Sequence, residues 1–346
     1  MAHDNSGFAL SHRSRPPASE IEPHPPPSPI RPSSSFSRVH RRLRAFRSLT
    51  ARSILESHPE EDAHGAYGLN LLSEPSEPRL NFIFVHGLGG GSRKTWSSSP
   101  GPGTFWPKEW LPSEPGFKHV RIYSYGYNSD WTKTQQSHLS IHDFAQALLA
   151  DMYNSTHLRK NGDTPIVLIA HSMGGLVAKK AYLLARRDPL YREFAERIHS
   201  MYFLATPHRG ADSAQTLSRV LASSIFYGSK TFVDELFPSS AMLQAINDDF
   251  RHVSADLQLW SFFEGVPTTS GPRSFLVVEK DSAVMNLPGE HIQYLEADHR
   301  HVCKFDSPAH PNYQIVQRCL LRAVEDIEKD CGLRARHILC LPSSPP

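Results

Sequence analysis

Short apolar runs alternate with amphipathic segments from about Ala63 onward. The apolar runs predict buried strands in LNFIFV, HVRIYSYGY, IVLI, RIHSMYFL, LQLWSFFE and SFLVVEKD. Apolar residues at helical spacing predict helices in LSIHDFAQALLADMYNS, GLVAKKAYLLAR and NYQIVQRCLLRAVEDIEK. Alternation of this kind predicts an α/β fold with a mostly parallel sheet and helices on both faces.

The pattern also divides the chain into three regions. Residues 1–62 are rich in proline, serine and arginine, so we expect a disordered N-terminal region. We expect one α/β domain at 63–335 and a flexible tail at 336–346. A helical, aromatic-containing insert from Ala211 to Asp256 interrupts the alternation. It is either a lid over an acyl-binding cleft or a set of ordinary helices packed against the sheet.

Charge limits the range of partners. The formal net charge of +2 gives no reason to expect nucleic acid as a partner. Basic residues concentrate at 38–52, RVHRRLRAFRSLTAR, which suits a targeting or membrane-surface helix or, more simply, a basic linker. No apolar run is long enough to span a membrane, so we expect peripheral membrane contact at most. The sequence gives no basis for an oligomeric state.

The cysteines and histidines show no metal-binding pattern. Four cysteines fall late in the chain without metal-ligand spacing, at Cys303, Cys319, Cys331 and Cys340. Free thiols in a reducing compartment explain them most simply, so we expect an intracellular and most simply cytoplasmic protein. Mitochondrial and membrane-associated locations remain alternatives. The 20 histidines are scattered, and we expect neither a metal nor a cofactor.

The stretch PIVLIAHSMGGLVAKK, residues 165–180, places Ser172 between a buried strand and a helix. Ala170 and Gly174 flank the serine two positions away on either side. A nucleophile elbow needs this arrangement, because a tight strand-to-helix turn exposes the serine hydroxyl and larger neighbours would collide. The usual pattern is G-x-S-x-G, and Ala170 replaces its first glycine. Alone, the pentapeptide fits a nucleophile and an ordinary glycine-rich turn equally well.

A second glycine-rich loop, HGLGG, follows the first predicted strand at residues 86–90. The backbone N–H groups of Leu88 and Met173 would form a two-donor oxyanion hole, in which one donor is worth about 3 kcal/mol. A phosphate-binding loop is the alternative, but the G-x-G-x-x-G spacing is missing. We expect His86 to anchor this loop and not to act in catalysis.

The segment EADHRHVCKF supplies a candidate base in His299, with His301 as its nearest rival. A serine hydroxyl becomes nucleophilic when an imidazole takes its proton, and the imidazole in turn needs a carboxylate. Glu264 and Asp281 end the strands predicted in LQLWSFFE and SFLVVEKD. We favour Glu264, because the usual hydrolase sheet order places the acid on the first of these strands and lets the second lead to the histidine. Asp281 remains the alternative. The order Ser, acid, His is that of α/β hydrolases.

Eight segments resemble the serine-active-site-containing, lipase-like α/β hydrolases: FIFVHGLGG, KTW, RIYSYGY, AHSMGGLVAKKA, ATPHRG, FFE, VVEKDSAVM and ADHRHVCKF. The resemblance covers roughly residues 63–329. It is closer still to the hydrolase domains that fungi place ahead of nucleotide-binding, repeat-bearing receptors, and more distant for GPI inositol-deacylases. It implies an esterase or lipase-type site and carries Ser172 and His299 over by motif. Ala170 departs from the family pattern, where relatives usually have glycine.

Together these features predict an α/β-hydrolase fold with a helical insert and a serine ester hydrolase of the carboxylesterase or lipase-like type. Ser172 would attack the carbonyl of an acyl ester, lipid esters included, and His299 would shuttle the proton. Two alternatives stay open. One is a signalling or interaction domain of the fungal receptor type that keeps the fold for binding, against which an intact triad argues. The other is a lipid transacylase.

Overall fold

The computed structural model describes residues 63–129, 140–160, 162–208, 219–220, 240–270 and 272–339. Its main sheet has seven strands in the order β1-β3-β2-β4-β5-β6-β9, with β1 antiparallel to β3 and the other neighbouring pairs parallel. The strands are β1 (Gly68–Ser73), β2 (Leu80–Val85), β3 (Val120–Gly126), β4 (Ile166–His171), β5 (Ile198–Leu204), β6 (Gln258–Glu264) and β9 (His291–Leu295). A separate hairpin pairs β7 (Thr268–Ser270) with β8 (Arg273–Phe275). The predicted mostly parallel sheet is confirmed.

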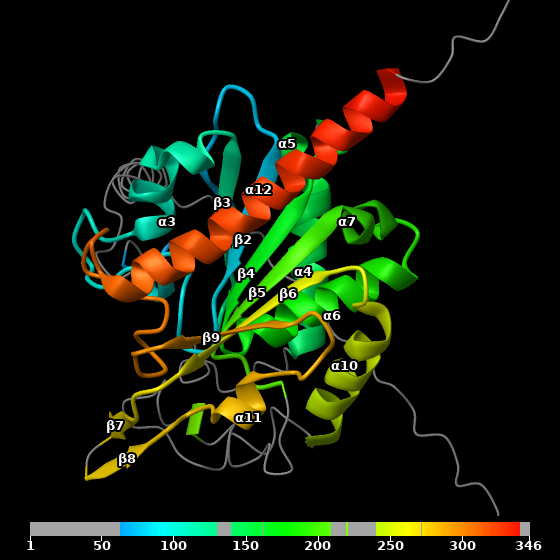
Figure 1. Cartoon of the computed structure of the whole chain (residues 1–346). Coiled ribbons are helices and arrows are strands. Elements are labelled where there is room, and N and C mark those ends of the chain that lie inside the picture. Colours follow the sequence, from blue (N-terminus) through cyan, green and yellow to red (C-terminus); the bar gives the residue numbers. More distant parts are fainter. Residues whose placement is uncertain are drawn as a thin grey trace, which may run out of the picture. The chain divides into compact units, whose positions relative to one another are not determined.

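Helices cover both faces of this sheet, and Figure 1 shows α12 crossing one face. The longer ones are α4 (Ile141–Asn154), α6 (Gly174–Arg187), α10 (Ser240–Val253) and α12 (Pro311–Leu339). Shorter helical turns are η1 (Lys94–Trp96), α3 (Trp106–Glu109), η2 (Leu111–Ser113), η3 (Pro115–Phe117), α5 (Thr156–Lys160), α7 (Arg192–Arg197) and α11 (Lys280–Ala283). The helix α12 continues beyond residue 335, where the sequence placed the end of the domain.

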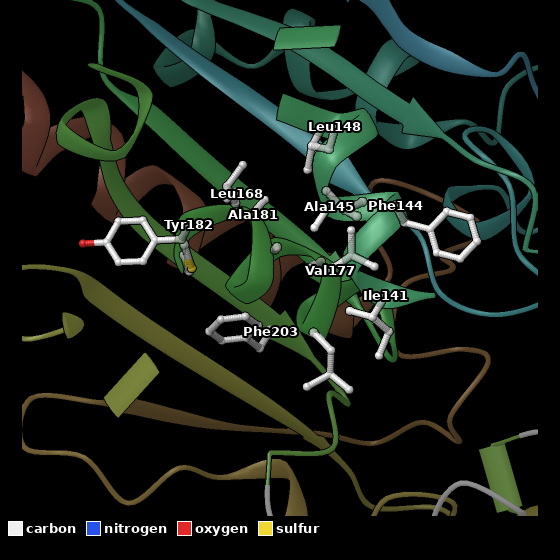
Figure 2. Packing of buried hydrophobic residues seen from close by; sticks show 14 of the residues in the cluster. Ile141, Phe144, Ala145, Leu148, Leu168, Val177, Ala181, Tyr182 and Phe203 are labelled. Carbon is white, nitrogen blue, oxygen red and sulfur yellow. The ribbon is translucent and has the colours of Figure 1, made fainter. Parts of the chain in front are cut away.

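Strand residues alternate between two buried clusters because successive side chains point to opposite faces. Ile83, Leu168 and Phe203 pack with α4 and α6 in one cluster. Phe82 and Val167 pack with α3 and α12 in the other. Figure 2 shows α4 and α6 turning their apolar side chains toward each other over β4 and β5. A strand buried on both faces reads as a continuous apolar run, which is why the central strands were predictable.

The helix α4 begins where the sequence chemistry requires. Ser140 and Asp143 form a capping box, in which the Ser140 N–H donates to Asp143 Oδ2 at 2.6 Å. Buried side chains then recur at Ile141, Phe144 and Leu148 along one face. The cap and the apolar stripe together fix this helix across the sheet.

The prediction that SFLVVEKD forms a strand of the main sheet is wrong. Only Arg273–Phe275 is extended there, as β8, and it pairs with β7 alone. Val277 and Val278 are fully buried, which explains why the sequence is apolar at these positions. The Val278 N–H nevertheless donates to the Glu264 carboxylate and not to a neighbouring strand. The strand that leads to His299 is instead β9, whose sequence HIQYL carries no long apolar run because it is the sheet edge. The polar-patterned edge strand β1 was missed for the same reason.

The helix α10 is the longest described element of the predicted insert. The helix α10 packs on α6, with the Phe250 ring centroid 5.9 Å from that of Tyr182 and 6.3 Å from that of Phe203. This helix is therefore an ordinary core helix. Residues 211–218 and 221–239 lie outside the described residues, as does the predicted N-terminal region 1–62, so the lid and the domain boundaries stay predictions.

The described part of the chain shows neither a membrane-spanning helix nor a cluster of metal ligands. None of its helices is both long and apolar enough to cross a lipid bilayer. No group of three or more metal-ligating side chains is present within the same residues. Cys303 and Cys319 are free thiols, and burial raises their pKa values to about 12 and about 11.

Candidate active site

Ser172 lies on the sharp turn between β4 and α6. Its φ of 53° is in the left-handed region, which a residue with a Cβ adopts only at a cost. The Ser172 N–H donates to the Leu204 carbonyl at 2.9 Å, and the Ser172 carbonyl accepts from the Gly175 N–H at 3.0 Å. Ser172 is only 2% exposed, so its hydroxyl lies among the surrounding loops and not at the open surface where the sequence placed it.

The turn forces other chain segments very close to the serine. A Cβ on Gly174 would overlap the carbonyl oxygen of His86. A Cβ on Gly87 would lie 2.9 Å from the Cβ of Ser172, closer than real Cβ atoms approach. Both glycines are therefore required where the loop after β2 meets the start of α6.

His299 reaches Ser172 from the loop after β9. Its Nε2 lies 2.9 Å from Ser172 Oγ, within hydrogen-bonding distance, and the residue is 2% exposed. The two residues are 127 positions apart in the chain, so only the sheet order brings them together. A neutral imidazole that accepts from the hydroxyl at Nε2 can remove its proton.

Glu264 ends β6 and approaches the opposite side of the His299 ring. Its Oε1 lies 3.6 Å from His299 Nδ1, and both side chains are buried. This separation is longer than a hydrogen bond, and Nδ1 has no hydrogen-bond partner among the described residues. The Val278 N–H donates to the same carboxylate oxygen and holds it in place. Contacts of this kind shorten when a catalytic site binds its substrate.

The two rival residues lie elsewhere. Asp281 is exposed in the first turn of α11. His301 is exposed on the surface, where its Nδ1 lies 2.6 Å from Asp298 Oδ1. Of the two candidate acids and two candidate bases, the structure therefore brings only Glu264 and His299 to the serine.

The loop after β2 is held by His86. Its Nε2 accepts from the Tyr127 N–H at 3.1 Å, its Nδ1 lies 2.9 Å from the Gly87 carbonyl, and its ring stacks on Tyr127 at 4.2 Å. Burial lowers the pKa of His86 to about 4, which keeps the ring neutral. These contacts agree with the loop-anchoring role expected from the sequence.

The two predicted oxyanion donors lie in loops next to Ser172. Met173 follows the serine at the N-cap of α6, with φ −59° and ψ −22°, and Leu88 follows Gly87 in the loop after β2. Neither N–H donates to another group within the described ranges. Within the part of the chain that the structure describes, both N–H groups could therefore serve as donors to a ligand, and the helix dipole adds positive potential at Met173.

Two further groups at this site were not predicted from the sequence. The Val278 N–H holds the Glu264 carboxylate, and the His171 side chain bonds to the backbone of His299. A backbone donor leaves no trace in a side-chain pattern. The position of His171, directly before Ser172, was a usable signal.

Comparisons with known proteins show which proteins this chain resembles. A family model described as a PGAP1-like alpha/beta domain matches residues 80–225, which include the loop after β2 and the Ser172 turn. Among curated proteins, Protein SERAC1 of Danio rerio is 29% identical over 288 residues, or 75% of this chain. Protein SERAC1 of Homo sapiens is 29% identical over 300 residues, or 80% of this chain. These alignments cover 41% and 43% of the relatives, so the chain spans less than half of their length.

The fold also has a counterpart among solved structures. The mature Bacillus licheniformis lipase BlEst2 superposes with a TM-score of 0.51 at 14% identity, over 74% of this chain and 99% of that one. An identity this low shows only the fold. The likeness to fungal receptor-associated hydrolase domains stays a prediction. The sheet order, the turn at Ser172 and these matches together show that the chain has the α/β-hydrolase fold and resembles the PGAP1-like group within it.

Proposed function

We propose that this protein is a serine ester hydrolase that uses Ser172, His299 and Glu264 as a catalytic triad. The observation that carries the proposal is the contact of His299 Nε2 with Ser172 Oγ at 2.9 Å, with Glu264 Oε1 at 3.6 Å on the other ring nitrogen. Three side chains that meet from the ends of three strands are what proton transfer from a serine requires, and their chain order of serine, acid, histidine is that of α/β hydrolases. The substrate class is a carboxylic acyl ester, lipid esters included.

The reaction would proceed in two halves. Ser172 Oγ attacks the ester carbonyl carbon while its proton passes to His299 Nε2, and the negative oxygen is held by the N–H groups of Leu88 and Met173. His299 then returns the proton to the leaving alcohol, which leaves an acyl group on Ser172. A water molecule repeats the sequence and releases the acid. Glu264 stabilises His299 while it carries the proton, and no cofactor is needed.

The test is Ser172→Ala with a fluorophosphonate probe and a panel of p-nitrophenyl esters of increasing chain length. The variant removes one hydroxyl, so we expect the fold to persist, labelling to vanish and turnover to fall by about four to six orders of magnitude. Adding a competing alcohol to the assay distinguishes a hydrolase from a transacylase, because the alcohol would capture the acyl group. Wild-type turnover in Ser172→Ala would refute the mechanism. An unlabelled wild-type protein would instead favour a binding domain.

A further inference from the structure

His171 makes one polar contact that the proposed mechanism does not use. Its Nε2 lies 2.8 Å from the backbone carbonyl oxygen of His299. A carbonyl oxygen can only accept, so His171 carries a proton on Nε2 and donates it. The two imidazole rings lie 5.1 Å apart at an angle of 46°. The residue next to the nucleophile is thus bonded directly to the main chain of the base.

The loop that carries His299 needs such a bond. His299 is four residues beyond the end of β9, where strand pairing no longer fixes the backbone. On its N-terminal side, the N–H groups of Gly265 and Val266 both donate to the Ala297 carbonyl at 3.2 Å. On its C-terminal side, the N–H groups of Arg300 and His301 donate to Asp298 Oδ1. The carbonyl of His299 itself is bonded to His171.

We propose that His171 is a positioning residue, which holds the main chain of His299 against the end of β4 so that His299 Nε2 stays within reach of Ser172 Oγ. The inference rests on the proposed function and deepens it. Without this bond the loop would keep its other hydrogen bonds but would lose the one that ties the His299 backbone to the residue next to the nucleophile. A misplacement of about 1 Å in a catalytic group can cost about 100-fold in rate.

The charge state of His171 suits this role. Burial, and then the neighbouring His299, lower the pKa of His171 to about 3. His171 is therefore neutral near pH 7 and always offers one N–H to the carbonyl. A protonated side chain at this place would repel the imidazolium that His299 becomes during the reaction.

The surroundings also restrict what can replace His171. A Cβ on Gly87 would lie 2.9 Å from the His171 carbonyl oxygen and 3.4 Å from its Nδ1, so the loop after β2 packs directly against this residue. The position needs a flat side chain whose hydrogen-bond donor lies as far from the backbone as Nε2 of His171 does. The amide nitrogen of glutamine lies at about the same distance from the backbone as Nε2 of histidine. The amide nitrogen of asparagine lies nearer, at about the position of Nδ1. Phenylalanine keeps the ring but has no donor.

The experiment compares His171→Gln, His171→Asn and His171→Phe with the wild type in ester turnover and fluorophosphonate labelling. The wild type and Ser172→Ala are assayed first, so failure of the proposed function is recognised separately. We expect kcat to fall about 10-fold to 100-fold in the phenylalanine and asparagine variants, with KM nearly unchanged. The glutamine variant should recover kcat to within about threefold of the wild type.

Two results would overturn the inference. One is wild-type kcat in His171→Phe, because the bond would then be dispensable. The other is equal loss in the glutamine and asparagine variants, because the reach of the donor would then not matter and only packing would. Thermal unfolding of each variant checks the fold. If the phenylalanine variant does not fold, the glutamine–asparagine pair alone decides, since both are short polar amides that differ by one methylene.

Discussion

At the residue scale, the site depends on a strained serine held by ordinary backbone bonds. The φ of 53° at Ser172 costs about 1–3 kcal/mol, and the bonds to Leu204 and Gly175 maintain it. The strain aims the side chain at His299 instead of along the sheet. Small residues around the turn are a condition for this geometry, because β2, α6 and the loop after β5 all converge there.

Ala170 tests that condition. It is fully buried in β4, in register with Val85 on one side and Phe203 on the other. Ala170→Leu adds three carbons to this packed position and should cost about 1–3 kcal/mol of stability as well as most of the activity. Ala170→Gly should keep most of the activity, because the usual elbow has glycine there. Ester turnover and urea unfolding measure both effects, and full activity in the leucine variant would show that the turn is not sterically constrained.

The acid of the triad is a second question at this scale. Glu264→Gln keeps the size of the side chain but removes its charge, so His299 would lose the group that stabilises its imidazolium. We expect kcat to fall about 10⁴-fold. Asp281→Asn is the matched control, since this carboxylate is exposed on α11, and it should change kcat less than about twofold. The reverse ranking in a steady-state assay would move the acid to Asp281.

At the element scale, a buried lysine connects α6 to α10. Lys179 is fully buried, and its Nζ lies 2.6 Å from His208 Nδ1 and 2.8 Å from Asn247 Oδ1. The same Nζ stands 5.2 Å and 5.0 Å from the ring centroids of Phe203 and Phe250. Burial lowers the pKa of Lys179 well below its usual value. One side chain therefore ties the helix behind the nucleophile to α10 and to the segment after β5.

Replacing this lysine should loosen the junction. Lys179→Met keeps the chain length but removes Nζ from two buried polar partners, so we expect a loss of about 1–3 kcal/mol in the free energy of unfolding by urea. Lys180→Met, one position along the same helix and half-buried, should change it by less than about 0.5 kcal/mol. The double variant Lys179→Met with Asn247→Leu should regain part of the loss, because removing both partners leaves fewer unpaired groups. Equal stability of Lys179→Met and the wild type would mean that the contacts contribute nothing.

At the scale of the whole molecule, buried histidines make the fold sensitive to acid. His86 has a folded pKa of about 4 against an ordinary value of about 6.5, and its Nε2 already accepts a hydrogen bond that protonation would destroy. Between these two pH values the unfolded chain binds the proton and the folded chain does not. Stability is therefore fully present above about pH 6.5 and falls as the pH drops toward 4.

The free energy of unfolding should therefore change with pH, with a slope that can be measured. Each such histidine contributes about 1.4 kcal/mol of stability per pH unit within that window. Urea unfolding at several pH values between 4.5 and 7 should show a shallower slope in His86→Gln than in the wild type, whatever the absolute stability of the variant. Identical slopes would exclude His86 as the titrating group. A proton NMR titration of the wild type is the independent check.

Much of the main sheet could be predicted because its central strands are buried on both faces. A continuous apolar run and a glycine-rich turn after it are local features, and they located β2, β4 and the elbow at Ser172. The candidate base His299 could also be predicted, because α/β hydrolases carry the histidine after the last strand and chain order is visible in the sequence. The edge strands β1 and β9 were not, because a half-exposed strand carries polar residues that hide it.

The sequence by itself determined which residue types could do the chemistry and the order in which they come. Only the tertiary structure decided which of them meet. The sequence favoured Glu264 but left Asp281 open as the acid, whereas the structure separates them: β6 pairs with β9 and so brings Glu264 to His299, while Asp281 is exposed on α11. The bond from His171 to the His299 carbonyl likewise joins residues 128 positions apart. Contacts across such separations depend on strand order and register, which no local pattern encodes.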